Sequence, residues 1–202
     1  MKCGKPVRRE QEYCGDCSRQ THIFNQGTAA FTYSDGLPDA LFRLKFQNRR
    51  DYLDFFAGAM TLAYQRRAVR WRPQQILPVP MHWRKRARRG YNQAELLAER
   101  ISQNTGIPME KNWAVCVRKT SEQKRLSRSE RQRNLRDSFQ VKKQFQGVTR
   151  VLLVDDVYTT GSTMDELARI LKKAGVKEVF FLVLCIGKGK KDGMHGEKSV
   201  LY

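Results

Sequence analysis

Two adjacent acids close the apolar run VLLVDD at residues 151–156, and the polar stretch VYTTGST follows directly. Unpaired carboxylates are costly to bury, so Asp155 and Asp156 are expected at the accessible end of a buried strand. A carboxylate repels a phosphate but is a good acceptor for the vicinal hydroxyls of a sugar. The acid pair therefore favours a site for ribose hydroxyls.

The stretch behind the acids has the composition of a phosphate site. A helix expected to begin at about Thr163 would offer unpaired N–H groups and a partial positive charge. The turn also supplies hydroxyl donors and a glycine that permits close approach: Thr159, Thr160, Gly161, Ser162 and Thr163. No GK[ST] follows the glycine, so this is not a P-loop. Acids and turn together predict a ribose 5-phosphate site; a helix cap beside a solvated acid pair is the alternative.

The whole string VLLVDDVYTTGST resembles the phosphoribosyl-pyrophosphate (PRPP) signature of type I phosphoribosyltransferases. The resemblance implies that Asp155 and Asp156 hold the ribose hydroxyls and that Thr159 through Thr163 hold the 5-phosphate. It also implies Mg²⁺ bound together with PRPP, mainly through ligand oxygens and water. The implied fold is α/β: a mainly parallel sheet flanked by helices, with a hood that selects the acceptor.

Three further segments resemble the ComF/GntX family of phosphoribosyltransferase-like proteins in their order along the chain. They are the Cys-bearing N-terminus, PVPMHWRKRARRGYNQAELLA and QKRLSRSERQRNLRDSF. That family is associated with competence, the uptake of DNA, and with use of DNA as a nutrient. The resemblance implies PRPP and a nucleobase-like acceptor of unknown identity as partners, with single-stranded DNA and the competence machinery as further candidates. A transferase and a non-catalytic PRPP-responsive or DNA-binding factor both remain open.

The first basic segment, RKRARRG, follows the strand that ends at Pro78-Val79-Pro80. In type I enzymes a loop at this position holds the pyrophosphate of PRPP, and a leaving pyrophosphate requires cationic donors. The resemblance assigns this role to Pro80, Arg84, Arg88 and Arg89, with Arg89 also a catalytic candidate. Asn92 and Gln93 are the polar residues of the same motif. A solvated basic loop is the alternative.

The second basic segment, residues 118–136, matches the position of a flexible loop that closes over the substrate in this superfamily. Closure would exclude water from a glycosyl cation-like transition state. Arg128 and Arg131, one helical turn apart, are the catalytic candidates, and Gln123 and Asn134 are the polar motif residues. The same cations would also suit a nucleic-acid backbone, and the sequence leaves both uses open.

Cysteines cluster at the N-terminus, where Cys14 and Cys17 form a C-x-x-C step opposite Cys3. This pattern predicts a zinc knuckle, which needs four ligands. Two candidates for the fourth ligand are a cysteine directly before Met1, if the true start lies upstream, and His22. Three reduced thiols on a frayed terminus are the alternative. Cys116 and Cys185 lie in apolar stretches and are expected to be buried and inert.

Periodicity predicts the elements that position these residues. Helices are expected over 37–46, 51–70, 91–106 and 162–175, and strands over 74–80, 113–117, 150–154 and 176–186. Alternating strands and helices indicate an α/β fold with a parallel sheet. We expect a knuckle-like segment at 1–24, a phosphoribosyltransferase-like domain at 28–187 with a hood at 28–70, and a disordered tail at 188–202.

The charge balance points to anionic partners. The 202 residues include 39 Lys and Arg against 20 Asp and Glu, a net charge of +19. Phosphorylated small molecules and nucleic acid both fit this surplus. No apolar stretch reaches the length of a membrane span, and the N-terminus lacks the apolar segment of a secretory signal. We therefore expect a cytoplasmic protein.

Overall fold

A four-stranded sheet forms the centre of the computed structural model, which describes residues 2–7, 11–33, 37–46, 51–117, 137–142 and 144–187. The strand order is β1-β6-β5-β2, and every neighbouring pair is parallel. The strands are β1 (Gln26–Thr32), β2 (Gln75–Pro78), β5 (Arg150–Tyr158) and β6 (Glu178–Ile186). Parallel strands bring their carboxyl ends to one edge, where open α/β sheets bind ligands. The α/β prediction is confirmed.

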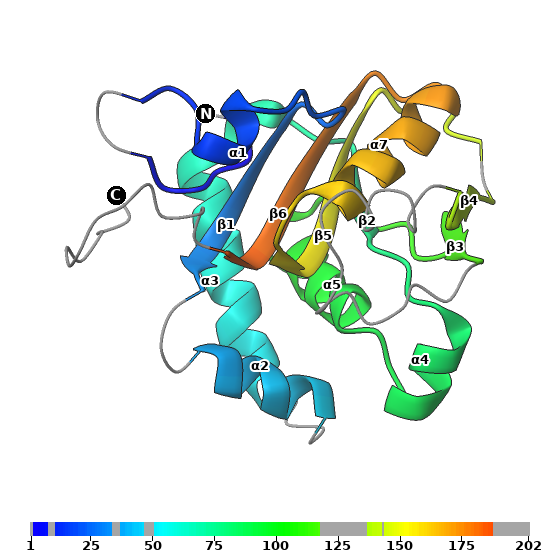
Figure 1. Cartoon of the computed structure of the whole chain (residues 1–202). Helices are drawn as coiled ribbons and strands as arrows, with labels where there is room; N and C mark the ends of the chain where they lie inside the picture. Colours follow the sequence, from blue (N-terminus) through cyan, green and yellow to red (C-terminus); the bar gives the residue numbers. More distant parts are fainter. Residues whose placement is uncertain are drawn as a thin grey trace.

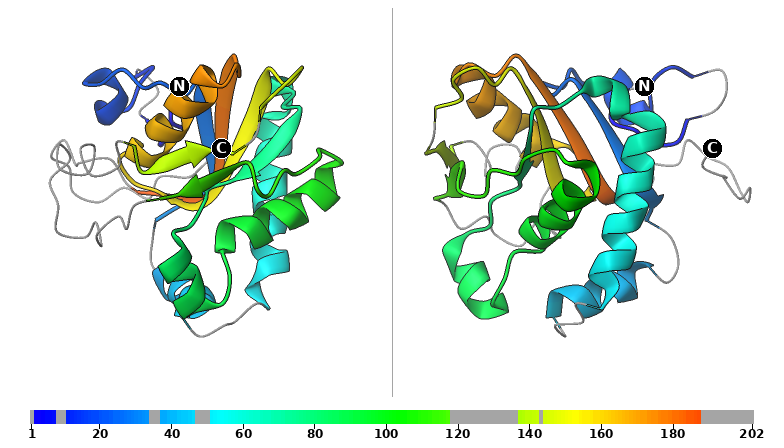
Figure 2. Two further views of the ribbon diagram at one scale, coloured as in Figure 1. Left: turned by 90° about the vertical axis from the view of Figure 1, so that its right-hand side faces the viewer. Right: turned by 180° about the vertical axis from the view of Figure 1, so that it is seen from behind.

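Helices cover both faces of this sheet (Figures 1 and 2). On one face lie α3 (Tyr52–Arg67) and α5 (Gln93–Thr105), and on the other lie α7 (Ser162–Lys173) and the N-terminal segment with its short α1 (Gly15–Ser18). Along β5, Leu152 packs into the core beneath α3 and α5, whereas Leu153 packs into the core beneath α7. Coverage of both faces explains why β5 and β6 are nearly continuously apolar.

Several helix boundaries follow directly from local sequence. The helix predicted over 37–46 is α2 (Leu37–Phe46). Helix α5 begins after Asn92, whose side chain accepts a hydrogen bond from the Ala94 N–H at 3.1 Å. It ends at Gly106, which has a φ of 73° and so adopts the left-handed conformation typical of a helix C-terminus. The C-terminal end of α5 matches the prediction, whereas the helix begins two residues later than predicted.

A second, two-stranded antiparallel sheet is separate from the main sheet. It pairs β3 (Ala114–Cys116) with β4 (Phe139–Val141). The strand predicted over 113–117 is therefore present, but in a separate two-stranded sheet. The segment 118–136 connects these strands and, like the tail 188–202, lies outside the described residues. Four predicted site residues fall there: Gln123, Arg128, Arg131 and Asn134.

Two elements differ from the sequence expectations. Strand β1 was not predicted and lies partly inside the stretch 28–70 assigned to the hood; its Gly27 sits against the Phe181 ring, where a larger side chain would clash. The basic segment is a helix, α4 (Trp83–Arg89), rather than the expected loop. His82 caps it by accepting the Arg84 N–H at 3.2 Å, and Gly90, with a φ of 83°, ends it.

The arrangement leaves α2 and α4 beyond the carboxyl ends of the strands (Figure 1). The Tyr91 hydroxyl donates to the backbone carbonyl of Leu44, which ties α2 to the connection between α4 and α5. Within the described part of the chain, no helix is both long and apolar enough to cross a membrane.

Candidate functional site

The acid pair lies where β5 reaches the carboxyl edge of the sheet. Asp155 and Asp156 are half-buried, and Asp155 still pairs in register with Val183 of β6. The Asp156 N–H donates to the Asp155 carboxylate at 2.8 Å, which fixes the orientation of the first acid. Pairing with β6 therefore holds the acids on ordered backbone, as a binding site requires.

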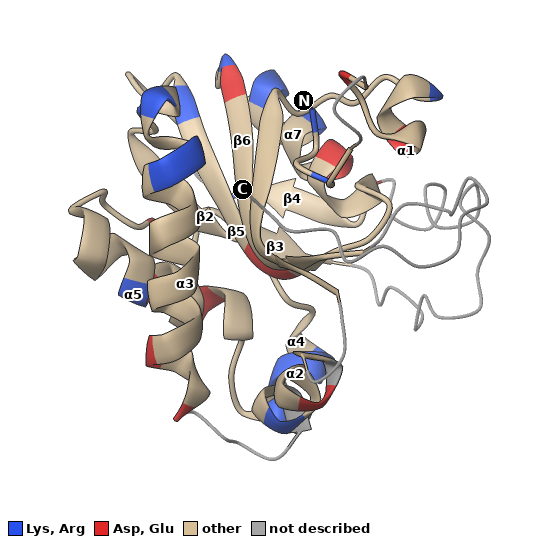
Figure 3. Ribbon diagram, turned by 90° about the vertical axis from the view of Figure 1, so that its left-hand side faces the viewer, with Lys and Arg blue, Asp and Glu red and all other residues tan. Residues whose placement is uncertain are grey.

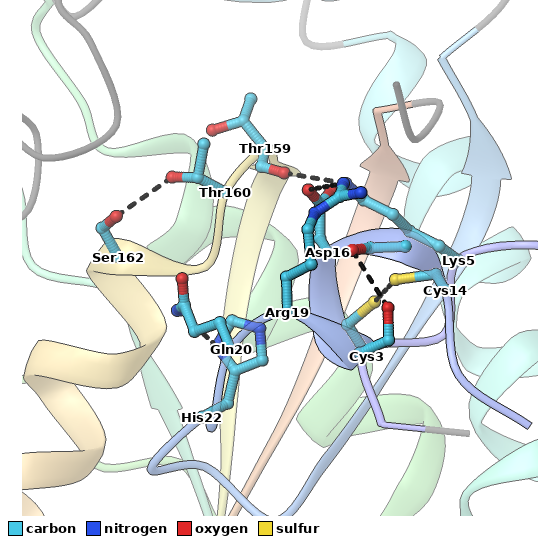
Figure 4. A network of polar contacts seen from close by, with 12 residues as sticks. Cys3, Lys5, Cys14, Asp16, Arg19, Gln20, His22, Thr159, Thr160 and Ser162 are labelled. Atoms are coloured by element: carbon cyan, nitrogen blue, oxygen red, sulfur yellow. Dashed lines mark hydrogen bonds and ion pairs between the residues drawn. The ribbon is translucent and has the colours of Figure 1, made fainter. Parts of the chain in front are cut away.

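The predicted phosphate turn joins β5 to the N-terminus of α7. Gly161 has a φ of 85°, and a Cβ there would lie 2.5 Å from the Tyr158 hydroxyl and 3.0 Å from His22 Cε1. Only glycine fits this position without strain. The Thr160 and Ser162 hydroxyls lie 3.0 Å apart (Figure 4), and α7 begins at Ser162. The structure thus brings Thr159 through Thr163 together at a helix N-terminus, where an anion is favoured.

The basic helix α4 faces this edge through one residue in particular. Partial burial lowers the pKa of Arg89, and the negative charge of Asp156 opposes that shift. The guanidinium and the carboxylate are therefore within electrostatic reach. Arg84 and Arg88 are exposed, and the Arg84 guanidinium lies 5.1 Å from the centre of the Trp83 ring. The structure thus brings the Arg89 guanidinium close enough to Asp156 for their charges to interact.

The two polar motif residues after α4 are buried, and Asn92 has a structural role. Its amide donates to the Val79 carbonyl at 2.9 Å while its oxygen caps α5. This contact holds the basic segment against the end of β2, next to Pro80. Gln93 is 2% exposed, and its amide nitrogen has no hydrogen-bond partner among the described residues.

Three N-terminal thiols form a compact cluster. The sulfur atoms of Cys3, Cys14 and Cys17 lie within 4.8 Å of one another, and the Cys3 and Cys14 sulfurs are 3.4 Å apart. Hydrogen bonds with Cys14 and Cys3, together with the nearby His22, lower the pKa of Cys17 despite burial. Such a cluster could hold a metal ion. Cys116 and Cys185 are buried in the core, as predicted.

The N-terminal knuckle, residues 2–7 and 11–24, contacts the predicted phosphate turn (Figure 4). The Lys5 ammonium, 3% exposed, lies 2.6 Å from the Asp16 carboxylate and donates to the Thr159 carbonyl at 3.1 Å. On α7, Asp165 accepts the Ile23 N–H at 2.7 Å. Sequence reasoning missed Lys5 and Asp165, because these contacts join segments more than 140 residues apart and leave no local pattern.

Comparison with known proteins agrees with this architecture. Residues 53–201 match the family model described as "Phosphoribosyl transferase domain". The match spans most of the chain and includes α3, α4, α5 and the β5–α7 turn. The fold therefore belongs to the phosphoribosyltransferase class.

Named relatives narrow this class. The chain is 35% identical to "Competence protein F" of Haemophilus influenzae, over 88% of this chain and 80% of that protein. It is 30% identical to "DNA utilization protein YhgH" of Salmonella typhimurium, over 91% of this chain and 82% of that protein. It is 26% identical to "Competence protein ComFC" of Bacillus subtilis, over 86% of this chain and 71% of that protein. The chain belongs to the ComF family of phosphoribosyltransferase-like proteins.

Proposed function

We propose that the chain binds PRPP with Mg²⁺ at the carboxyl edge of β5 and transfers the phosphoribosyl group to a nucleobase-like acceptor. One arrangement carries the proposal: Asp155 and Asp156 lie in the last part of β5, the hydroxyl-rich turn follows at the start of α7, and the charge of Arg89 interacts with that of Asp156. A sugar diol, its phosphate and a pyrophosphate each meet complementary groups there.

Each part of the ligand has an assigned partner. The ribose hydroxyls would donate to Asp155 and Asp156, and the 5-phosphate would accept from the backbone and hydroxyls of Thr159 through Thr163. The pyrophosphate would meet Arg89, with Arg84 and Arg88 on the same helix adding positive charge. Carboxylates beside phosphates are the oxygen donors that Mg²⁺ prefers, and the ion would offset charge on the pyrophosphate.

Positioning and charge stabilisation would supply the catalysis. The bond between ribose C1 and the pyrophosphate oxygen breaks, and a bond from C1 to the acceptor forms, with no side chain acting as nucleophile. Arg89 would stabilise the charge that develops on the leaving pyrophosphate. From the family resemblance, Arg128 and Arg131 would close over the ligand and exclude water. The acceptor would lie beneath the hood, for which α2 is the candidate.

The names of the relatives suggest the process. Two are called competence proteins and one a DNA utilization protein. We infer that this chain also acts in the uptake or use of DNA, where imported DNA yields bases and nucleosides that a phosphoribosyl transfer could salvage. A cytoplasmic location remains a prediction.

Calorimetric titration with PRPP and Mg²⁺ tests the ligand. The double variant Asp155→Asn/Asp156→Asn should weaken binding by about 10–100-fold, because charged hydrogen bonds to the ribose are removed. Asp54→Asn is the matched control, since Asp54 is exposed on α3 and pairs with Arg100. If the double variant and the control bind PRPP with equal affinity, Asp155 and Asp156 do not contribute to the binding site.

Turnover distinguishes an enzyme from a binding protein. The full chain, Mg²⁺ and labelled PRPP are incubated with a panel of nucleobases, and pyrophosphate release is followed. Release that depends on one base, and is abolished in Asp155→Asn/Asp156→Asn, supports transfer. Tight PRPP binding without release for any base would instead favour a PRPP-responsive factor.

A basic groove favours a second function, binding of single-stranded DNA. A cavity of about 510 Å³ lies at the outer edge of β1, beside the C-terminal end of α3 and the short helix η1 (Val69–Trp71). Arg66, Arg67 and Arg70 line it together with Trp71. Figure 3 shows Lys and Arg gathered at this end of α3. Phosphate groups of a nucleic-acid backbone suit such a groove.

Fluorescence anisotropy with a labelled oligonucleotide tests the groove. Arg66→Ala/Arg70→Ala should weaken binding and reduce the salt slope by about 0.7 for each phosphate that is no longer neutralised. Lys172→Ala/Lys173→Ala, two cations at the end of α7, removes the same charge from the other face of the sheet. An equal weakening in both double variants would indicate net charge rather than the groove.

A further inference from the structure

Helix α3 carries apolar side chains on its outward face as well as on the face that it buries. Its inner face packs into the core through residues that include Phe56, Met60 and Tyr64. On the outer face, Phe55 is 66% exposed and Leu62 is 45% exposed. A surface helix normally presents polar residues to solvent, and a helix that is apolar all round is normally covered. The outer face of α3 is therefore a candidate interaction surface.

The exposed apolar residues of α3 form one stripe. Intervals of three and four residues place its members on one side of the helix: Phe55, Gly58, Ala59 and Leu62. The Phe55 ring also stacks on Phe31 of β1, with 6.4 Å between the ring centres, which widens the apolar surface. Seen from behind in Figure 2, α3 lies in front of the sheet, and no described element covers it. Exposed apolar surfaces of this kind mark interaction sites.

The stripe is self-complementary about its centre. The two central residues, Gly58 and Ala59, are small, and a Cβ added at Gly58 would meet no neighbouring atom within 4 Å, so another helix can approach closely. Phe55 and Leu62 lie equally far from this centre along the axis. When two copies pair antiparallel about it, Phe55 of one copy meets the partner's Leu62. A two-fold interface requires such a surface, so a second copy of this chain fits the stripe.

The charges at the two ends of α3 favour the same antiparallel pairing. The exposed charged residues are Asp51 and Asp54 at the N-terminal end, and Arg66 and Arg70 at the C-terminal end. Asp51 and Arg66 lie equally far from the centre of the stripe, so antiparallel pairing sets Arg66 beside the partner's Asp51 twice. A parallel pair would instead place like charges together, which is unfavourable. Antiparallel helices also oppose their dipoles.

We infer that α3 is the interface of a homodimer, in which two copies pack this helix antiparallel across a two-fold axis at Gly58 and Ala59. The interface is on the side of α3 that faces away from the sheet, so the inference does not depend on the proposed PRPP site. It competes with DNA binding in the basic groove, because the pairing covers Arg66, which also lines that groove. One helix face is a small interface, so association falls in the micromolar range.

Sedimentation velocity on the full chain, freed of nucleic acid, tests the dimer over a concentration series. The wild-type chain should change from monomer to dimer in the micromolar range. Leu62→Asp should weaken association by about 10-fold or more, because it buries an unpaired charge in the stripe. Val117→Asp is the matched control and should have no effect, since Val117 is 40% exposed beside β3 in the separate two-stranded sheet. A chain that stays monomeric throughout this range, or equal association in both variants, would overturn the inference.

A charge swap tests the antiparallel register with two exposed residues. Arg66→Glu alone faces the partner's Asp51 with a like charge and should weaken association about 10-fold, and Asp51→Arg alone should do the same. The double variant Asp51→Arg/Arg66→Glu should restore wild-type association, because opposite charges meet again. Arg49 and Arg50 precede this pair in the sequence, lie outside the described residues and stay unchanged in every variant. Circular dichroism checks that each variant is folded, and a double variant no better than the single variants would overturn the pairing.

Discussion

The backbone N–H of Val79 donates to the carbonyl of Val154 at 2.9 Å. This bond extends the β2–β5 pairing by one residue and sets the residue before Pro80 beside the residue before Asp155. The basic helix α4 and the acid pair therefore leave the sheet as neighbours. Because this bond is part of a parallel β-ladder, we expect substitutions in α4 and in the acid pair to affect the same binding site.

Arg89 should matter more than other arginines on α4. Arg89→Ala should weaken binding of Mg²⁺–pyrophosphate by about 10–100-fold, since it removes a charge-assisted hydrogen bond to phosphate. Arg86→Ala is the matched control: Arg86 is 47% exposed and pairs with Glu95. Calorimetry with pyrophosphate measures both. If the control weakens binding as much as Arg89→Ala does, α4 contributes only general charge.

Gly161 should not tolerate a side chain. Its positive φ, and the nearby Tyr158 hydroxyl and His22 ring, should make Gly161→Ala lower the free energy of unfolding by about 1–3 kcal/mol. Gly58→Ala provides the control, because Gly58 lies within α3 with open space around it. That change should raise the free energy of unfolding by about 0.5–1 kcal/mol. Urea unfolding measures both variants. A change in the free energy of unfolding with the same sign in both would contradict the geometry of the turn.

Asn92 should contribute to stability through two hydrogen bonds at once. Asn92→Ala removes the cap of α5 and the donor to the Val79 carbonyl, so the free energy of unfolding should fall by about 2 kcal/mol. Asn104→Ala, near the other end of α5, removes a single bond to Thr61 and should cost less than about 1 kcal/mol. Chemical denaturation measures both variants, and similar decreases would show that Asn92 does not fasten α4 to the sheet.

Lys5 should stabilise the contact between knuckle and turn. Lys5→Met leaves Asp16 and the Thr159 carbonyl without their buried cation, and the free energy of unfolding should fall by about 3 kcal/mol. The exposed pair of Arg100 with Asp54 serves for comparison, and Arg100→Met should change stability by less than about 1 kcal/mol. Thermal and urea unfolding measure both. A small effect of Lys5→Met would mean that the knuckle docks mainly through His22.

Local patterns predicted much of the fold. The periodicity of 37–46 identified α2 at its observed bounds, and Gly106 marked the end of α5. The apolar runs at 150–154 and 176–186 predicted two strands of the parallel sheet. These signals succeed because burial on a face and helix capping depend on residues that are close in sequence.

The missed features depend on distant residues. Strand β1 contains QGTAAFT, with no clear alternation, and it becomes a strand through pairing with β6 about 150 residues later. The α4 segment reads as a polar loop unless His82 and Gly90 are recognised as its ends. The contact of His22 with Asp165 spans 143 residues, so only the fold reveals it.

The acid pair and the turn could be predicted from sequence because both lie in one continuous segment. A strand, a turn and a helix start in direct succession keep Asp155, Asp156 and Gly161 close in space as well as in sequence. Arg89 was predicted separately, and its electrostatic interaction with Asp156 depends on the β2–β5 pairing, which no local pattern reveals.

A crystal structure of the full chain with PRPP and Mg²⁺ tests the central claim most directly. We predict ribose hydroxyl oxygens at hydrogen-bond distance, about 2.5–3.0 Å, from the Asp155 or Asp156 carboxylates. The 5-phosphate should contact the backbone amides of Thr159 through Thr163, with Arg89 facing the pyrophosphate. PRPP bound elsewhere, or a 5-phosphate turned away from α7, would contradict the account.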